Sequence, residues 1–163
     1  MENISAPGRM EFIRSEKPEG CVFCKESARD ESLILYDDGV ISYMLNKYPY
    51  NTGHVLIVTN RHVGELDELT PEERFKIMEG MEKIVTVLKQ ILNPQGFNIG
   101  LNLGQAAGAG IVDHFHLHVV PRWNGDTNFM TCVAETRVTP EDVTVTCRQL
   151  KPMFEKMVRG GVK

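Results

Sequence analysis

Short apolar runs bounded by turn residues recur along the first half of the chain and again in its middle. Two of them, over 33–36 and 40–45, flank the turn Asp37-Asp38-Gly39 and predict a β-hairpin. Three more have the length and composition of strands and lie over 55–59, 97–103 and 115–120. The pattern therefore predicts five strands, which we expect to form one sheet.

Helical periodicity fills the segment between the third and fourth runs. Thr70 is placed to cap a helix, Pro71 suits its first position, and Glu73 can return the capping bond. Asn93-Pro94 is expected to end the helix at about residue 92. Apolar residues at helical spacing predict a core-facing stripe made of Phe75, Met78, Met81, Ile84, Val85, Leu88 and Ile91.

A second helix start, Thr139-Pro140-Glu141-Asp142, predicts a C-terminal helix that Pro152 should break or kink. The order of strands, long helix, strands and helix lacks βαβ alternation, so the expected class is α+β with an antiparallel sheet. The chain has 163 residues, of which 42% are hydrophobic. This suits a single domain over 1–163, with a core over about 20–130 and a helical extension over about 139–158.

Charge and hydropathy argue against nucleic acid and membranes as partners. The 18 Lys and Arg residues are scattered among 22 acidic residues, and the net charge of −4 argues against binding to nucleic acid. The first 17 residues mix both charges, and no segment approaches the roughly 20 apolar residues that span a membrane. We therefore expect neither secretion nor membrane association, and the cytoplasm is the expected compartment.

Histidines occupy alternate positions of the fifth predicted strand, in the run His114-Phe115-His116-Leu117-His118-Val119-Val120. Because strand side chains alternate between faces, the three imidazoles share one face at intervals of roughly 6 to 7 Å, and the apolar residues share the other. Imidazole titrates with a pKa of about 6.5, so this row suits metal binding, phosphate contact or proton and phosphoryl transfer. The alternative, a half-exposed polar strand, is disfavoured because three imidazoles in register pack poorly.

A Gly-rich loop over 102–110 lies just before the histidines. Glycine allows successive backbone amides to point the same way, and such a concavity holds anionic oxygens. A tight turn between two strands would have the same composition. The position of the loop beside the histidine row favours a phosphate cradle.

Cys21 and Cys24 are spaced to bind one metal ion, although a redox pair and a plain turn share this C-x-x-C pattern. A redox site would need a preceding strand, whereas Pro18-Glu19-Gly20 predicts a turn. Zinc is therefore favoured, and its other ligands would come from the five histidines of the chain. Cys132 and Cys147 stand alone and are predicted to be buried or incidental thiols.

The histidine row resembles the signature of the histidine-triad superfamily of nucleotide hydrolases and transferases, His-φ-His-φ-His-φ-φ with φ apolar. Leu45-Asn46 and Gly53-His54-Val55-Leu56 resemble the ribose-binding strand and hairpin of that superfamily. The segment 121–129 resembles the branch that contains diadenosine tetraphosphate phosphorylases and related hydrolases. The likeness covers roughly residues 6–130. It implies a five-stranded antiparallel sheet that dimerises into a ten-stranded sheet.

The resemblance also implies roles for individual residues. His116 would be the nucleophile and would form a nucleotidyl-imidazole that water or phosphate cleaves, with His114 and His118 beside it. His54 would lie near the nucleotide as a packing residue. The implied nucleotide and phosphate contacts are Asn46, Asn102, Gln105, Gly108, Gly110 and His118. The implied ligands of a structural zinc are Cys21, Cys24, His62 and His114.

The chain departs from the superfamily pattern in two places. Gly110 and Ile111 stand where many members have Ser or Thr, and Gly8 stands where relatives of this branch have Trp.

Three functions consequently stay open. The first is an enzyme that cleaves a dinucleoside polyphosphate or another nucleotide conjugate by hydrolysis or phosphorolysis. The others are a zinc-stabilised nucleotide-binding module with little catalysis and a metal-dependent hydrolase with the triad as its ligands.

Overall fold

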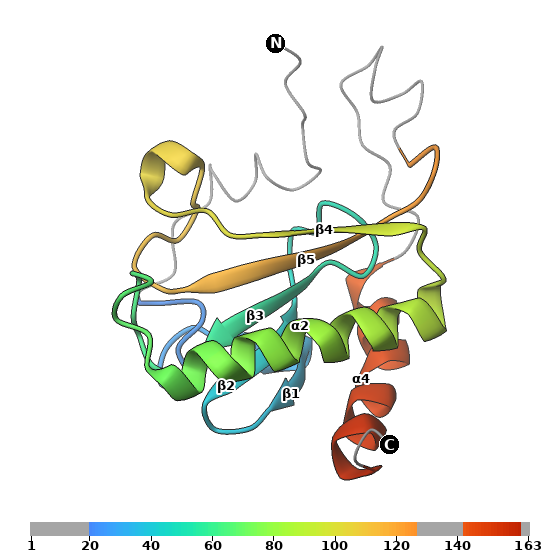
Figure 1. Cartoon of the computed structure of the whole chain (residues 1–163), viewed down its shortest axis with the longest axis horizontal. Coiled ribbons are helices and arrows are strands. Elements are labelled where there is room, and N and C mark those ends of the chain that lie inside the picture. The colour runs from blue at the N-terminus through green and yellow to red at the C-terminus, as the bar shows by residue number, and fades with distance from the viewer. Residues whose placement is uncertain (1–19, 127–141, 161–163) are drawn as a thin grey trace.

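The computed structural model describes residues 20–126 and 142–160, and its centre is one five-stranded sheet (Figure 1). The strands lie in the order β1-β2-β3-β5-β4, and every neighbouring pair is antiparallel. Their bounds are β1 Ile34–Asp37, β2 Ile41–Leu45, β3 Val55–Thr59, β4 Gly96–Gly100 and β5 His116–Arg122. The predicted α+β class and the five antiparallel strands are confirmed.

The two strands nearest the histidines differ from the predicted bounds. β5 begins at His116 because the Phe115 amide donates to the Val63 carbonyl at 2.6 Å, outside the sheet ladder. β4 ends at Gly100, opposite His118, and the chain then leaves the sheet for a loop that contains the short 3₁₀ helix η2 (Gln105–Ala107). The Gly-rich segment therefore leaves the sheet at the level of the histidines.

Helix α2 (Pro71–Leu92) begins with the predicted capping box, in which Thr70 Oγ1 accepts from the Glu73 amide and the Glu73 carboxylate accepts from the Thr70 amide. The predicted stripe is partly wrong, because Phe75 and Met78 are 68% and 65% exposed. Gly80 lies against β2 and β3, where a Cβ would meet Tyr43. Because the helix approaches the sheet closely at Gly80, the buried face of α2 is the one that contains this residue. Phe75 and Met78 consequently point away from the core. The buried apolar side chains are Ile77, Ile84, Val87 and Leu88.

Helix α4 (Val143–Gly160) packs on β1 and α2, on the same face of the sheet. Its predicted start at 139–141 lies outside the described residues. Of the break or kink predicted at Pro152, the break is wrong, since the helix continues through this residue with Leu150 and Phe154 buried on either side. The Phe154 ring lies 5.7 Å from that of Tyr43 on β2, and this contact holds the helix to the core. Within the described residues, no helix is long and apolar enough to cross a membrane.

Candidate active site and metal centre

The alternation along β5 separates a core face from a histidine face. Phe115, Leu117 and Val119 are buried on the face that α2 covers. His116 and His118 point to the other face, where they lie opposite Val58 and Leu56 of β3. His114 lies two residues before the strand and is fully buried. The sequence pattern therefore predicts the face of His116 and His118 correctly, while His114 lies outside the strand.

The tautomer of His116 is set by the backbone. Its Nδ1 lies 2.8 Å from the carbonyl oxygen of His114, and a carbonyl can only accept, so Nδ1 carries a proton. Burial lowers the pKa of His116, so the ring is neutral at pH 7. A neutral ring with its proton on Nδ1 has a lone pair on Nε2, which is the arrangement of a nitrogen nucleophile.

His118 receives the opposite tautomer through His54. The Tyr50 amide donates to Nδ1 of His54 at 3.1 Å, so His54 carries its proton on Nε2. This Nε2 lies 2.9 Å from Nδ1 of His118 and donates to it. His118 in its neutral form consequently carries its proton on Nε2. The Tyr50 ring stacks on His54 at 5.0 Å and holds its plane.

The free side of His118 is a buried donor. Burial, reinforced by the neighbouring His116, lowers the pKa of His118 to about 4, so the ring is neutral at pH 7. Among the described residues, its Nε2 has no hydrogen-bond partner. The rings of His116 and His118 lie 5.1 Å apart. Two adjacent imidazoles thus differ in role, since one presents a lone pair and the other an N–H group that lacks an acceptor.

Four side chains converge beside this pair as a candidate metal centre. The ligand atoms of Cys21, Cys24, His62 and His114 all lie within 4.8 Å of one another. Nδ1 of His114 is 3.3 Å from the Cys21 sulfur and 3.6 Å from the Cys24 sulfur, and Nδ1 of His62 is 3.3 Å from the Cys24 sulfur. Tetrahedral zinc, with bonds of about 2.1 to 2.3 Å, places its ligands roughly 3.5 Å apart. The residues therefore fit a zinc ion.

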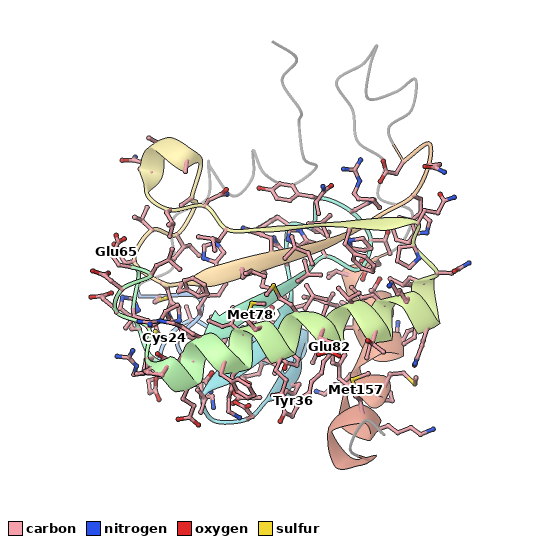
Figure 2. The ribbon with its side chains drawn as sticks, in the orientation of Figure 1. Cys24, Tyr36, Glu65, Met78, Glu82 and Met157 are labelled. Atoms are coloured by element: carbon pink, nitrogen blue, oxygen red, sulfur yellow. The ribbon has the colours of Figure 1, made fainter. Side chains whose placement is uncertain are left out.

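The surroundings of the cluster agree with metal binding. The Nε2 proton of His114 goes to the Thr59 carbonyl at 2.7 Å, which turns the Nδ1 lone pair toward the cysteines. Burial and the neighbouring Cys21 raise the pKa of Cys24 to about 11. A pair of thiolates at neutral pH would consequently require a cation. Figure 2 shows Cys24 at the end of the sheet where β5 begins.

The residues implied as nucleotide contacts are less tightly assembled. Asn46 lies beside His54, with its Nδ2 3.4 Å from His54 Nδ1, while its Oδ1 accepts from the Tyr48 amide at 2.9 Å. The remaining implied contacts follow β4 in the loop that leaves the sheet near His118, and the described hydrogen bonds do not join them to the histidines. They are Asn102, Gln105, Gly108 and Gly110, of which Asn102 is half-buried and the others are exposed.

Sequence reasoning missed three groups of the site. The Thr59 carbonyl and the Tyr50 amide act through the backbone, so no side-chain pattern indicates them. Phe23 lies between the two cysteines and packs on His114 and His116, with ring centroids 5.5 and 5.0 Å away. An aromatic residue inside a C-x-x-C loop was a readable signal for a buried loop. His54 is more than a packing residue, because it donates to His118.

The fold and the site define a histidine-triad protein, in which one strand of an antiparallel sheet carries alternate imidazoles beside a Cys₂His₂ cluster. A HIT domain profile matches residues 27–125, which is more than half of the sequence. The chain therefore belongs to the HIT domain family.

Relatives with described activities match most of the family region. An AP-4-A phosphorylase of Mycobacterium tuberculosis (strain H37Rv) is 42% identical over 121 residues, which are 74% of this chain and 62% of that protein. This chain thus spans less than two thirds of that relative's length. The asymmetrical bis(5'-nucleosyl)-tetraphosphatase of Schizosaccharomyces pombe is 32% identical over 95 residues, 58% of this chain and 52% of that protein. A solved Zn-bound histidine triad family protein from Mycobacterium smegmatis is 29% identical with a TM-score of 0.64, over 80% of this chain and 88% of that chain.

Proposed function

We propose that this protein cleaves a dinucleoside polyphosphate such as diadenosine tetraphosphate at its α-phosphate, with His116 as the nucleophile. The observation that carries the proposal is the pairing of the His116 Nε2 lone pair with the buried, unpartnered Nε2–H of His118. An anionic phosphate oxygen would satisfy that donor. The names of the phosphorylase and tetraphosphatase relatives support the substrate class.

In the first step, the His116 Nε2 lone pair forms a bond to the α-phosphorus while the bond from phosphorus to the bridging oxygen breaks. The released polyphosphate leaves as an anion and takes the electron pair of that bond. The ring keeps its Nδ1 proton, and the His114 carbonyl stabilises the positive charge that develops there. The His118 N–H would donate to an oxygen of the reacting phosphate as negative charge accumulates.

In the second step, water or phosphate attacks the nucleotidyl-imidazole and the Nε2–P bond breaks, which returns the electron pair to His116. Water gives AMP and releases a proton to solvent, whereas inorganic phosphate gives ADP. The phosphate contacts we propose besides His118 are Asn102, Gln105, Gly108 and Gly110, and Asn46 would bind ribose.

We assign the four-ligand cluster to zinc with a structural role. Four protein ligands leave no open position for water or substrate, so the ion would supply a cross-link between three segments of the chain. A metal-dependent hydrolase with the triad as ligands is disfavoured, because His54 donates to Nδ1 of His118, whose Nε2 then carries the proton, and because Nδ1 of His114 faces the cysteines instead. A nucleotide-binding module with little catalysis is the second candidate, motivated by Gly110 and Ile111 in place of a hydroxyl residue.

Analysis of the reaction products separates hydrolysis, phosphorolysis and nucleotide binding without catalysis. Wild-type protein is incubated with diadenosine tetraphosphate, with and without inorganic phosphate, and the nucleotides are resolved by chromatography. Hydrolysis gives ATP and AMP in both conditions, and phosphorolysis gives ATP and ADP with phosphate only. Binding of the dinucleotide without any product would contradict the enzymatic proposal and support the binding module.

His54 is expected to act as a positioning residue for His118. In His54→Phe the donor to His118 Nδ1 is lost and the tautomer of His118 is no longer fixed. We expect kcat to fall roughly 10²-fold with a smaller change in KM, because the substrate still binds but its phosphate is misaligned. His54→Gln, which keeps an N–H donor, should recover part of kcat. Wild-type kcat in His54→Phe would show that His54 serves only packing.

The subunits are proposed to pair through β4. This strand forms one edge of the sheet, with β5 as its neighbour in the described structure. Ile99 on β4 is 44% exposed and lies on the same face as α2, where Phe75 and Met78 are also exposed. Figure 2 labels Met78 on α2, the helix that covers this face of the sheet. An exposed edge strand, with exposed apolar side chains on the same face of the sheet, favours pairing with a second copy, which would give a ten-stranded sheet.

A charge on this edge should separate the subunits. Ile99→Lys brings two like charges together across the proposed two-fold axis, so we expect the mass from light scattering to halve at micromolar concentration. Leu66→Lys is the matched control, since Leu66 is 45% exposed and lies in the loop before α2. Wild-type protein that elutes as a monomer would contradict the proposed dimer.

A further inference from the structure

The candidate metal centre and the proposed nucleophile share one residue. The side chain of His114 faces the two cysteines, while its backbone carbonyl accepts the Nδ1 proton of His116 at 2.8 Å. The Thr59 carbonyl holds the far side of the His114 ring at 2.7 Å. A displacement of His114 would therefore move the acceptor that fixes the His116 tautomer.

The candidate metal centre and the proposed nucleophile also share contacts with the loop over 21–24. Phe23 lies between Cys21 and Cys24 and is buried, with 6% of the residue exposed. It packs edge-on against His114 and at a tilt against His116, at 5.5 and 5.0 Å between centroids. The Nδ1–H bond fixes one atom of the His116 ring, and the Phe23 ring restricts rotation of its plane. Both restraints are needed to aim Nε2 in one direction.

The position of Phe23 depends on what holds the two cysteines. The loop lies outside the sheet, and its described backbone bonds are turn bonds, from the amides of Cys24 and Ala28 to the Cys21 carbonyl at 3.2 and 3.3 Å and from the Ser27 amide to the Cys24 carbonyl at 3.1 Å. The Phe23 amide donates to the Cys21 sulfur at 3.5 Å. The ion pairs of this region begin later in the chain, where Lys25 and Arg29 reach Asp37. A metal held by both sulfurs would fix the loop on either side of Phe23.

We propose that Phe23 is a positioning residue that couples metal occupancy of the Cys21, Cys24, His62 and His114 cluster to the orientation of His116. This inference rests on the proposed function only for its effect on catalysis. The coupling itself does not require a bound nucleotide. Zinc then has two effects, because it cross-links the chain and also aligns the proposed nucleophile through Phe23 and the His114 carbonyl.

The test is long-range ¹H–¹⁵N spectroscopy of the histidine rings at neutral pH. Zinc-loaded wild type should show His116 as a single tautomer with its proton on Nδ1. Chelated wild type and zinc-loaded Phe23→Ala should both show a mixed or broadened His116 signal, and Phe23→Tyr, which keeps the ring, should resemble wild type. Nucleotidyl transfer to His116 in a single turnover should fall about 10- to 100-fold in Phe23→Ala while zinc content stays at one per chain.

An unchanged His116 signal in Phe23→Ala, or in chelated wild type that stays folded, would overturn the proposal. If chelated protein loses its far-ultraviolet circular dichroism, the Phe23→Ala result decides alone, since that variant keeps its zinc. Failure of the proposed function has a different signature. Wild type would then form no nucleotidyl-His116 with diadenosine tetraphosphate, while the dependence of the His116 signal on zinc and Phe23 would persist.

Discussion

Replacing His116 with asparagine is expected to reduce turnover of diadenosine tetraphosphate by at least about 10⁴-fold. Asparagine can still donate to the His114 carbonyl, so the fold and the His114 position are retained. What it lacks is the ring Nε2 lone pair, and no covalent nucleotide can form at this position. The measurement is the initial rate of product formation by chromatography, with wild type and variant at equal zinc content.

A second readout separates loss of the nucleophile from loss of binding. Wild type quenched during turnover should carry one nucleotidyl group on the peptide that contains His116, labile in acid as a phosphoramidate is, and the variant should carry none. The affinity for AMP should change little, because His118 keeps its free N–H. Turnover by His116→Asn within about tenfold of wild type would refute the covalent mechanism and require direct attack by water or phosphate.

The sheet was predictable because its strands are short apolar runs with turns between them. Val55–Thr59 has the predicted bounds, since every residue of it is buried and the run ends where burial ends. The buried face of α2 was not predictable in the same way. Apolar residues cover more than half of its circumference, and the position of Gly80 against Tyr43 decides which of them face inward. That contact depends on tertiary packing, which helical spacing does not contain.

In the site, too, some features were predictable from the sequence and others depend on tertiary packing. Alternation in β5 predicted which faces the histidines occupy, and cysteine spacing with family resemblance brought together the four candidate metal ligands. The tautomers could not be predicted, because they depend on the Tyr50 amide and the carbonyls of Thr59 and His114. These are backbone groups whose positions exist only in the folded chain. The chemical difference between His116 and His118 therefore arises from their neighbours rather than from the repeated motif.

Removing the metal ligand Cys24 is expected to lower the melting temperature by roughly 10 °C. The proposed zinc joins the 21–24 loop, the segment after β3 and the start of β5, so its binding free energy contributes directly to folding. Loss of about 3 to 5 kcal/mol corresponds to roughly 2 to 4 °C for each kcal/mol in a chain of this size. Cys24→Ala and chelation of wild type should give similar shifts in differential scanning calorimetry.

Cys147→Ala is the matched control for Cys24→Ala. Its thiol is buried in α4 and donates to the Ser32 carbonyl at 3.2 Å, outside the four-ligand cluster. Cys147→Ala should cost about 1 kcal/mol, or a few degrees, and should keep one zinc per chain by metal analysis. If Cys24→Ala and chelation leave the melting temperature unchanged, the cluster carries no structural metal. The 3.3 Å contacts between thiols and imidazoles would then be ordinary hydrogen bonds, and the Cys21 thiol would hold His114 together with the Thr59 carbonyl and the Phe23 ring.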